Sequence, residues 1–68
     1  MERNTVNSSN LVSVGYDEDS HTLEIEFKKS IYQYFNVPVH IYEELMASDS
    51  KGIYHHQYIK NNYPYERV

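Results

Sequence analysis

The strictest constraint in this 68-residue sequence is the stretch from residue 21 to residue 28, in which apolar and charged side chains alternate. Successive side chains of a β-strand point to opposite faces, so a period of two is typical of a strand with one buried face. The apolar face comprises Leu23, Ile25 and Phe27, and the charged face comprises Glu24, Glu26 and Lys28. The stretch therefore predicts a strand in a sheet that is covered on one side only.

Two further strands are predicted beside this one. Residues 11–16 form a short β-rich run with Val12, Val14 and Tyr16 on one face, and a polar turn follows at residues 17–20. A reversal at Lys29-Ser30 leads into residues 31–37, where aromatic and β-branched residues predominate. Both faces of this third strand carry large apolar groups, so the pattern leaves open which one is buried. Three consecutive strands with short connections predict an antiparallel meander.

Helical patterns follow the strands. Pro38 suits the first turn of a helix, where its missing N–H costs nothing, and residues 39–47 then present one wide apolar face. Residues 51–60 predict a second short helix, and the Asn- and Pro-containing residues 61–68 predict an extended tail. The sequence thus predicts one α+β domain over residues 1–68: a three-stranded antiparallel meander packed by one helix, with a second short helix and an extended C-terminal tail. The expected core comprises Val12, Val14, Leu23, Ile25, Phe27, Phe35, Ile41 and Leu45.

Composition excludes several classes of function. The chain has no cysteine, which rules out disulfides and thiolate metal sites, and no stretch is long and apolar enough to span a membrane. His55 and His56 point about 100° apart on a helix, so they cannot share a metal ion. No serine lies in a nucleophile elbow, and neither glycine lies in a phosphate-binding loop. We therefore expect a cytoplasmic protein that is not an enzyme and has no metal or other cofactor.

Charge and aromatic side chains indicate where a ligand would bind. Residues 1–50 carry three cations against nine acids, whereas residues 51–68 carry three cations against one acid. Lysine and arginine contact phosphates, and tyrosine rings stack on bases. The predicted nucleic-acid-binding surface therefore comprises Lys51, Tyr54, Tyr58, Lys60, Tyr63, Tyr65 and Arg67.

A second aromatic motif is Tyr32-Gln33-Tyr34, whose two rings lie about 7 Å apart on one side of a strand. Rings spaced in this way on a sheet stack consecutive bases in several small RNA-binding domains. They are also common in cores, and we favour the interpretation that they pack beneath the helix.

Taken together, these segments resemble the KTSC domain, a family named for the C-terminus of certain lysyl-tRNA synthetases. The resemblance covers nearly the whole chain and implies the stand-alone form found in small proteins of bacteria and their phages. Relatives commonly carry glycine where this chain has Lys29-Ser30, so we expect a looser turn here. The residues that carry the resemblance are Ser8-Ser9-Asn10-Leu11, Ser13-Val14-Gly15-Tyr16-Asp17, Leu23 to Phe27, Tyr32-Gln33-Tyr34-Phe35-Asn36-Val37-Pro38, Tyr42, Ser50-Lys51-Gly52 with Tyr54, Ile59, and Tyr63-Pro64-Tyr65-Glu66-Arg67.

The first functional expectation is a non-catalytic RNA- or tRNA-binding module that uses the C-terminal surface. One alternative is a protein-interaction or inhibitory module, including one encoded by a phage, that uses the same tyrosines. Another is capture of a small nucleotide, which requires a concave pocket. The sequence is compatible with a monomer and with a homodimer formed through an edge strand.

Overall fold

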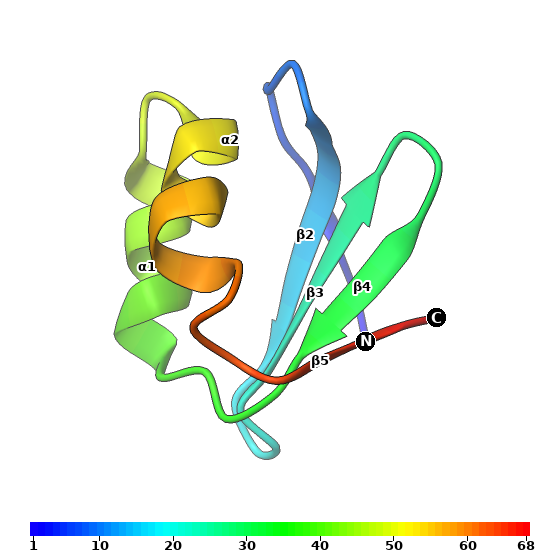
Figure 1. Cartoon of the computed structure of the whole chain (residues 1–68), viewed down its shortest axis with the longest axis vertical. Helices are drawn as coiled ribbons and strands as arrows, with labels where there is room; N and C mark the ends of the chain where they lie inside the picture. The colour runs from blue at the N-terminus through cyan, green and yellow to red at the C-terminus, as the bar shows by residue number, and fades with distance from the viewer.

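The computed structural model describes all 68 residues and has two layers, a β-sheet and a set of helices that cover one of its faces (Figure 1). The five antiparallel strands lie in chain order, so the sheet is a simple meander. The strands are β1 (Asn4–Thr5), β2 (Leu11–Asp17), β3 (Thr22–Phe27), β4 (Ile31–Tyr34) and β5 (Tyr65–Arg67). The helical layer consists of α1 (Val39–Ala47), α2 (Lys51–Tyr54) and the π-helical turn η1 (His55–Ile59), which continues α2.

The predicted α+β class and the order of the three long strands are confirmed, but the prediction of a three-stranded sheet was wrong. The tail predicted to be extended contains β5, which pairs with β4 and places Tyr65 opposite Tyr34. At the other edge, β1 pairs with β2. These edge strands have two and three residues, which is too short for an alternating pattern to show in the sequence. None of the helices has the length and apolar character that crossing a membrane requires.

The prediction of which β2 side chains are buried was wrong for the first residues of the strand. A β-bulge between Leu11 and Ser13 adds one residue to the strand and shifts the alternation of side chains. Leu11 is consequently buried, whereas Val12 is only half-buried, and the Val12 carbonyl accepts a hydrogen bond from the Val6 N–H. Leu11 thus takes the place in the core that the sequence pattern assigned to Val12.

The third strand, whose buried face the sequence left open, turns Tyr32 and Tyr34 toward the helices. Tyr34 lies opposite Leu23 of β3, so both side chains share the inner face. The strand also ends three residues earlier than predicted, and Asn36 adopts a positive φ of 59°. Because of this turn Val37, rather than Phe35, enters the core.

The core lies between the sheet and the helical layer. Phe27 and Ile41, both expected there, are partly buried against it. The fully buried apolar residues are Leu11, Val14, Leu23, Ile25, Tyr34, Val37, Leu45 and Ile59.

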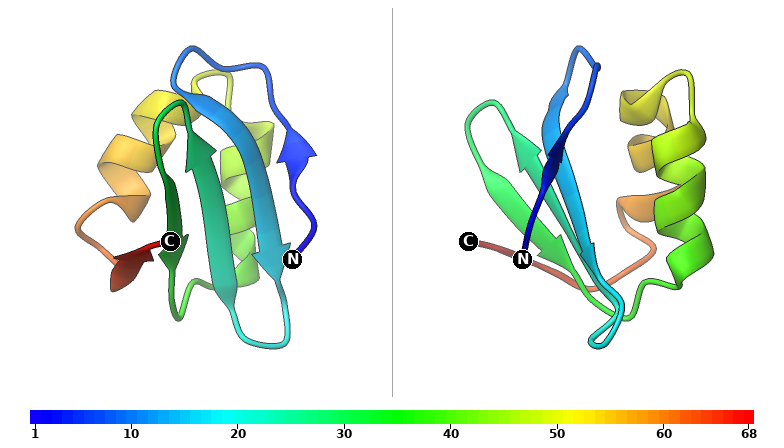
Figure 2. Two further views of the ribbon diagram at one scale, coloured as in Figure 1. Left: turned by 90° about the vertical axis from the view of Figure 1, so that its right-hand side faces the viewer. Right: turned by 180° about the vertical axis from the view of Figure 1, so that it is seen from behind.

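The opposite face of the sheet carries no helix (Figure 2), and Ser13, Glu24, Glu26 and Gln33 form side-chain hydrogen bonds there. Gly15 lets the N-terminal segment cross this face, because a Cβ there would lie 2.5 Å from the carbonyl oxygen of Glu2. Arg3 then forms an ion pair with Glu24, which also accepts a hydrogen bond from Gln33 at 2.8 Å. The hydrogen bond from Gln33 and the Arg3 guanidinium hold the pKa of Glu24 below its usual value. The buried Glu24 carboxylate is therefore satisfied within the protein.

Replacing Ile25 with Asp should abolish cooperative unfolding. The Ile25 side chain has no exposed surface, and a domain of this size has roughly 3–5 kcal/mol of net stability, which an unpaired buried carboxylate would consume. Urea unfolding followed by circular dichroism measures the effect. The matched control is Ile53→Asp, the same change at a side chain that is 59% exposed, which should shift stability by less than about 1 kcal/mol. A cooperative transition in the Ile25→Asp variant would contradict the core described above.

Candidate functional site

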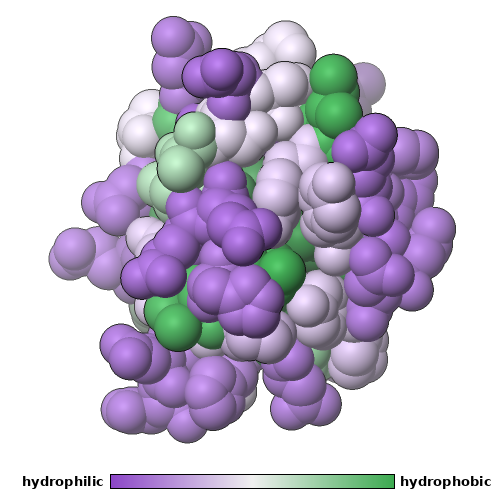
Figure 3. All heavy atoms as spheres, turned by 90° about the vertical axis from the view of Figure 1, so that its left-hand side faces the viewer, coloured by the Kyte–Doolittle hydropathy of each residue, from purple (hydrophilic) through white to green (hydrophobic).

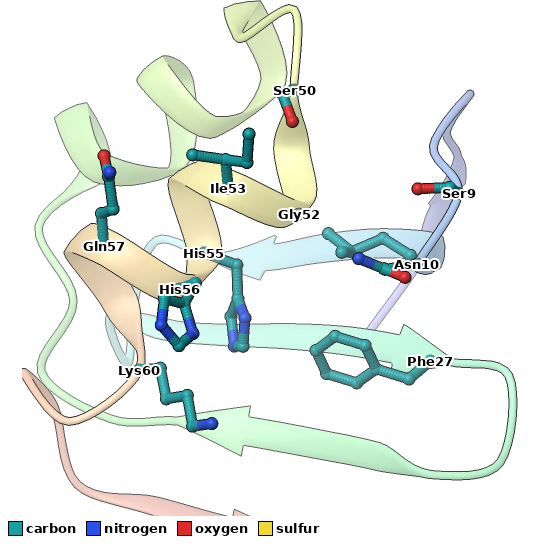
Figure 4. Close-up of a pocket in the computed structure, with 11 residues that line it drawn as sticks. Ser9, Asn10, Phe27, Ser50, Gly52, Ile53, His55, His56, Gln57 and Lys60 are labelled. Carbon is teal, nitrogen blue, oxygen red and sulfur yellow. The ribbon is translucent and has the colours of Figure 1, made fainter.

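A groove of about 920 Å³ runs between α2–η1 and the adjoining ends of β2 and β3 (Figure 4). A smaller hollow of about 260 Å³ adjoins it over β4 and β5 and shares Phe27, His55 and Lys60 with it. We call the two together the helix–sheet groove. The first part is lined by Ser9, Asn10, Leu11, Phe27, Ser50, Gly52, Ile53, His55, His56, Gln57 and Lys60, and the second adds Ser30, Tyr32, Tyr34, Asn61 and Tyr65.

The helical wall of the groove is held in place at three points. At its start, Gly52 allows close contact with the loop before β2, since a Cβ there would lie 2.7 Å from Nδ2 of Asn10. At its end, the Lys60 N–H donates to the His55 carbonyl at 2.8 Å, the bond that closes the π-turn, and Ile59 is completely buried. In the middle, His55 contacts Tyr34 and Phe27 of the sheet. Single π-turns occur often at functional sites, and this one forms the wall directly above the groove.

The floor of the groove is built around a hydrogen bond between His55 and Tyr34. Nε2 of His55 lies 2.7 Å from the Tyr34 hydroxyl, and the imidazole ring packs edge-on against Phe27 with a centroid distance of 5.1 Å. Burial, aided by the positive charges of Lys60 and His56, lowers the pKa of His55 to about 4. Burial raises the pKa of Tyr34 to about 12. Near neutral pH this hydrogen bond therefore joins a protonated phenol and a neutral imidazole.

The aromatic strand motif divides between the core and the groove. Tyr34 is only 3% exposed and its hydroxyl is bonded to His55, so its ring belongs to the core. Tyr32 is half-buried and contacts the rings of Phe27 and Tyr65 at centroid distances of 5.8 and 5.7 Å. Tyr34 thus lies in the core, whereas Tyr32 borders the second part of the helix–sheet groove.

The predicted C-terminal surface is split by the fold. Lys60 and Tyr65 line the helix–sheet groove, and Arg67 lies beside the β3–β4 hairpin with its guanidinium 3.4 Å from the Lys29 carbonyl. Tyr63 packs against the core.

The other three predicted residues do not line the groove. The Lys51 amine donates to the Ser48 carbonyl at 3.0 Å, in the connection between α1 and α2. The rings of Tyr54 and Tyr58 contact each other at 4.7 Å, and the Tyr54 hydroxyl donates to Glu44 at 2.7 Å. Burial and the Glu44 carboxylate together raise the pKa of Tyr54 above its usual value.

The fold also assembles cations that the sequence analysis did not group. Lys28 and Lys29 of the β3–β4 hairpin line a hollow with Arg67. This hollow shares Phe27 and Ser30 with the helix–sheet groove, which Lys60 also lines. We call Lys28, Lys29, Lys60 and Arg67 the basic rim; it contains four of the six cations of the chain. The sequence could not predict this cluster, because residues 29 and 67 become neighbours only through the pairing of β4 with β5.

One acid, Glu26, also lies in the hollow beside the hairpin. Its carboxylate accepts a hydrogen bond from Ser13 at 2.8 Å and lies 3.8 Å from the Arg3 guanidinium. The charge of Glu26 is therefore compensated on the outer face of the sheet rather than by the basic rim.

These features define a class of small α+β domain, a five-stranded antiparallel meander with one helical layer and a groove between the two. The chain belongs to the KTSC domain family, whose model matches residues 7–63, which confirms the resemblance. A crystal structure of a KTSC domain protein from Yersinia pestis has a TM-score of 0.96 to this chain at 35% sequence identity, covering 98% of this chain and 96% of that one.

Similar sequences occur in two contexts. A lysine–tRNA ligase of a Nostoc species is 44% identical over 54 residues, which cover 78% of this chain but only 10% of that protein. An uncharacterized protein of Stutzerimonas stutzeri is 37% identical over 70 residues, covering 100% of this chain and 99% of that protein. The chain thus spans about a tenth of the length of the ligase, and nearly all of the small protein.

Lowering the pH from 7 to 4 should weaken the fold through His55. An unfolded histidine binds a proton near its ordinary pKa of 6.5, whereas the folded one does so only near 4, so the unfolded chain binds more protons in this window. The contribution of His55 to stability is therefore complete above pH 6.5 and is lost as the pH falls to about 4. Acidic groups titrate there too, so the measurement is the difference in unfolding free energy between the wild type and His55→Gln.

That difference should shrink steadily between pH 7 and pH 4, because the titrating carboxylates are common to both proteins. A difference that does not vary with pH would contradict the buried, neutral state of His55. NMR titration of the imidazole signals provides a direct check on the same group.

Proposed function

We propose that this domain is a non-catalytic module that binds single-stranded RNA along the helix–sheet groove. The observation that carries the proposal is the basic rim, which places four of the six cations of the chain beside a concave surface lined by aromatic rings. Cations bind the phosphates of a nucleic acid, and aromatic rings provide platforms on which unpaired bases stack. Phe27 and Tyr65 are the groove residues best suited to that second role.

The net charge of −4 does not oppose this proposal, because the charges are segregated along β3. The acidic turn of Asp17, Glu18 and Asp19 precedes this strand, and the Lys28-Lys29 hairpin follows it. A strand of six residues is about 20 Å long, whereas the Debye length at physiological ionic strength is about 8 Å. Salt therefore screens the basic rim from the acidic turn, and an RNA strand at the rim experiences mainly positive charge.

The family supports RNA as the ligand. A protein named as a lysine–tRNA ligase, and therefore acting on tRNA, contains a segment 44% identical to this chain. Unpaired loops and ends are the parts of an RNA whose bases can be splayed onto aromatic side chains. A small domain with a cationic groove matches such a segment better than it matches a regular duplex.

The protein-interaction alternative has less support from the surface. The exposed large apolar side chains of the helical layer are Val39, Ile53 and Tyr58. In the space-filling view of this layer, hydrophobic groups are scattered among hydrophilic ones (Figure 3). Surfaces that dock a protein partner usually present a contiguous apolar patch.

Reversing the charge of the rim should weaken RNA binding. The variants are Lys60→Glu and Arg67→Glu, and the measurement is fluorescence anisotropy with a labelled single-stranded RNA of ten nucleotides at several salt concentrations. Each variant should lower affinity several-fold and reduce the slope of log K against log salt by about 0.7, the contribution of one phosphate contact to a single strand.

Lys51→Glu is the matched control, since it makes the same change in net charge at an amine that is bonded to Ser48 outside the groove. It should retain most of the affinity. An equal loss in all three variants would show that only net charge matters and would refute the groove as the site. Absence of wild-type binding even at low salt would refute the function.

A further inference from the structure

The β3–β4 hairpin extends beyond the helical layer and carries another concave surface (Figure 1). This hollow of about 350 Å³ is lined by three members of the basic rim, Lys28, Lys29 and Arg67, and we call it the hairpin hollow. It adjoins the helix–sheet groove through Phe27 and Ser30, which line both. The one remaining hollow of the protein shares no residue with it, so the connected concave surface ends at the hairpin.

The short connection of the hairpin brings two of these cations together. The Phe27 N–H donates to the Ser30 carbonyl at 2.7 Å, which leaves Lys28 and Lys29 as the two residues of the connection. Their Cα atoms are consequently about 3.8 Å apart. Arg67 reaches the same place from β5, where its guanidinium donates to the Lys29 carbonyl at 3.4 Å. The hollow thus gathers three positively charged groups from two segments that are far apart in the sequence.

None of these three cations forms an ion pair within the protein. The ion pairs of the structure are those of Arg3 with Glu24 and Glu26. Glu26 is the one acidic side chain that lines the hollow, and Arg3 and Ser13 engage its carboxylate on the outer face of the sheet. Even with a free α-carboxylate at Val68, which also lines the hollow, two positive charges remain there. The hollow therefore matches an anion that carries more than one negative charge.

Phosphate occurs in an RNA strand in two chemical forms. Inside the strand it is a diester, with a single charge and two free oxygens. At the end of a strand it is a monoester, with three free oxygens and a charge of about −1.5 to −2 at neutral pH. Hydrogen bonds from lysine and arginine to phosphate are charge-assisted, and three cationic side chains can serve all three oxygens of a monoester. The hairpin hollow therefore suits a terminal phosphate better than an internal one.

We infer that the hairpin hollow binds the terminal phosphate monoester of an RNA strand whose adjoining nucleotides lie in the helix–sheet groove. This inference rests on the proposed RNA-binding function and adds a preference for strand ends to it. One strand can reach both places, because the hollow and the groove share Phe27 and Ser30. A strand that stops at the hairpin loses no contact with the groove, since the concave surface ends there as well.

The experiment is a competition assay followed by fluorescence anisotropy. A labelled ten-nucleotide oligouridylate is displaced by unlabelled oligouridylates of the same length that carry a 5′-phosphate, a 3′-phosphate or neither. With the wild type, a phosphate at the end that enters the hollow should lower the concentration needed for displacement about fivefold, the upper end of what one exposed ion pair contributes. Inorganic phosphate at the same concentration should displace far less RNA than any oligomer, since it makes no contact in the groove.

Lys29→Gln and Arg67→Gln each remove one cation of the hollow without adding a negative charge, and both side chains are exposed. In each variant the phosphorylated competitor should lose most of its advantage. Lys60→Gln is the matched control, because it makes the same change in charge in the groove but outside the hollow. It should weaken the binding of all oligomers alike and keep the fivefold ratio. Thermal unfolding verifies that each variant is folded; should Arg67→Gln be unfolded, the Lys29→Gln result decides.

The two proposals fail in different ways. Equal displacement by the three oligomers, together with weaker binding by Lys60→Glu, would refute the terminal-phosphate site and leave RNA binding intact. An advantage that persists in the Lys29→Gln variant, or that Lys60→Gln removes to the same extent, would also refute this site. So would displacement by inorganic phosphate that equals displacement by the oligomers. Absence of binding to the labelled oligomer would refute the proposed function itself.

Discussion

The structure depends on the fact that β3, the central strand, has one apolar face. Leu23 and Ile25 on this face are completely buried, and a chain of 68 residues can supply helices for only one side of a sheet. The other side must then be stable without a covering layer. Arg3, Glu24 and Gln33 meet that requirement with an ion pair and a hydrogen bond on the outer face. The helical layer therefore has borders along which the inner face of the sheet is no longer covered.

The groove forms at such a border. The helical wall formed by α2 and η1 has nine residues, and Ile59 anchors it over the core, while the β3–β4 hairpin extends beyond it. His55 and Tyr34 fill the space beneath the wall with a hydrogen bond, and leaving either buried polar group unpaired would cost about 1–3 kcal/mol. The floor is therefore neutral near physiological pH, and the charges beside the groove are those of the basic rim.

Prediction from the sequence succeeded where a pattern was long and failed where pairing was decisive. The alternation at residues 21–28 and the apolar face of residues 39–47 identified β3 and α1. The bulge after Leu11 could not be predicted, because an extra residue in a strand leaves no mark on composition. The basic rim depends on β4–β5 pairing across more than thirty residues, and Lys51, which the charge count had grouped with it, donates instead to Ser48. Local periodicity predicts which side chains are buried, whereas the candidate site depends on strand pairing between residues far apart in the sequence.

The hydroxyl groups of the tyrosines separate structural rings from those available to a ligand. Tyr16 and Tyr54 donate to the Val37 carbonyl and to Glu44, and Tyr34 shares a hydrogen bond with His55, so the orientations of these three rings serve the fold. Tyr65 makes no such bond, is 58% exposed and lines the groove, yet its ring rests against Tyr32 and Tyr34 at 5.7 Å. A ring already held in this way loses little conformational entropy when a base stacks on it, which favours binding. Among the eight tyrosines, Tyr65 therefore has the best combination of exposure and preorganisation for the RNA contact that we propose.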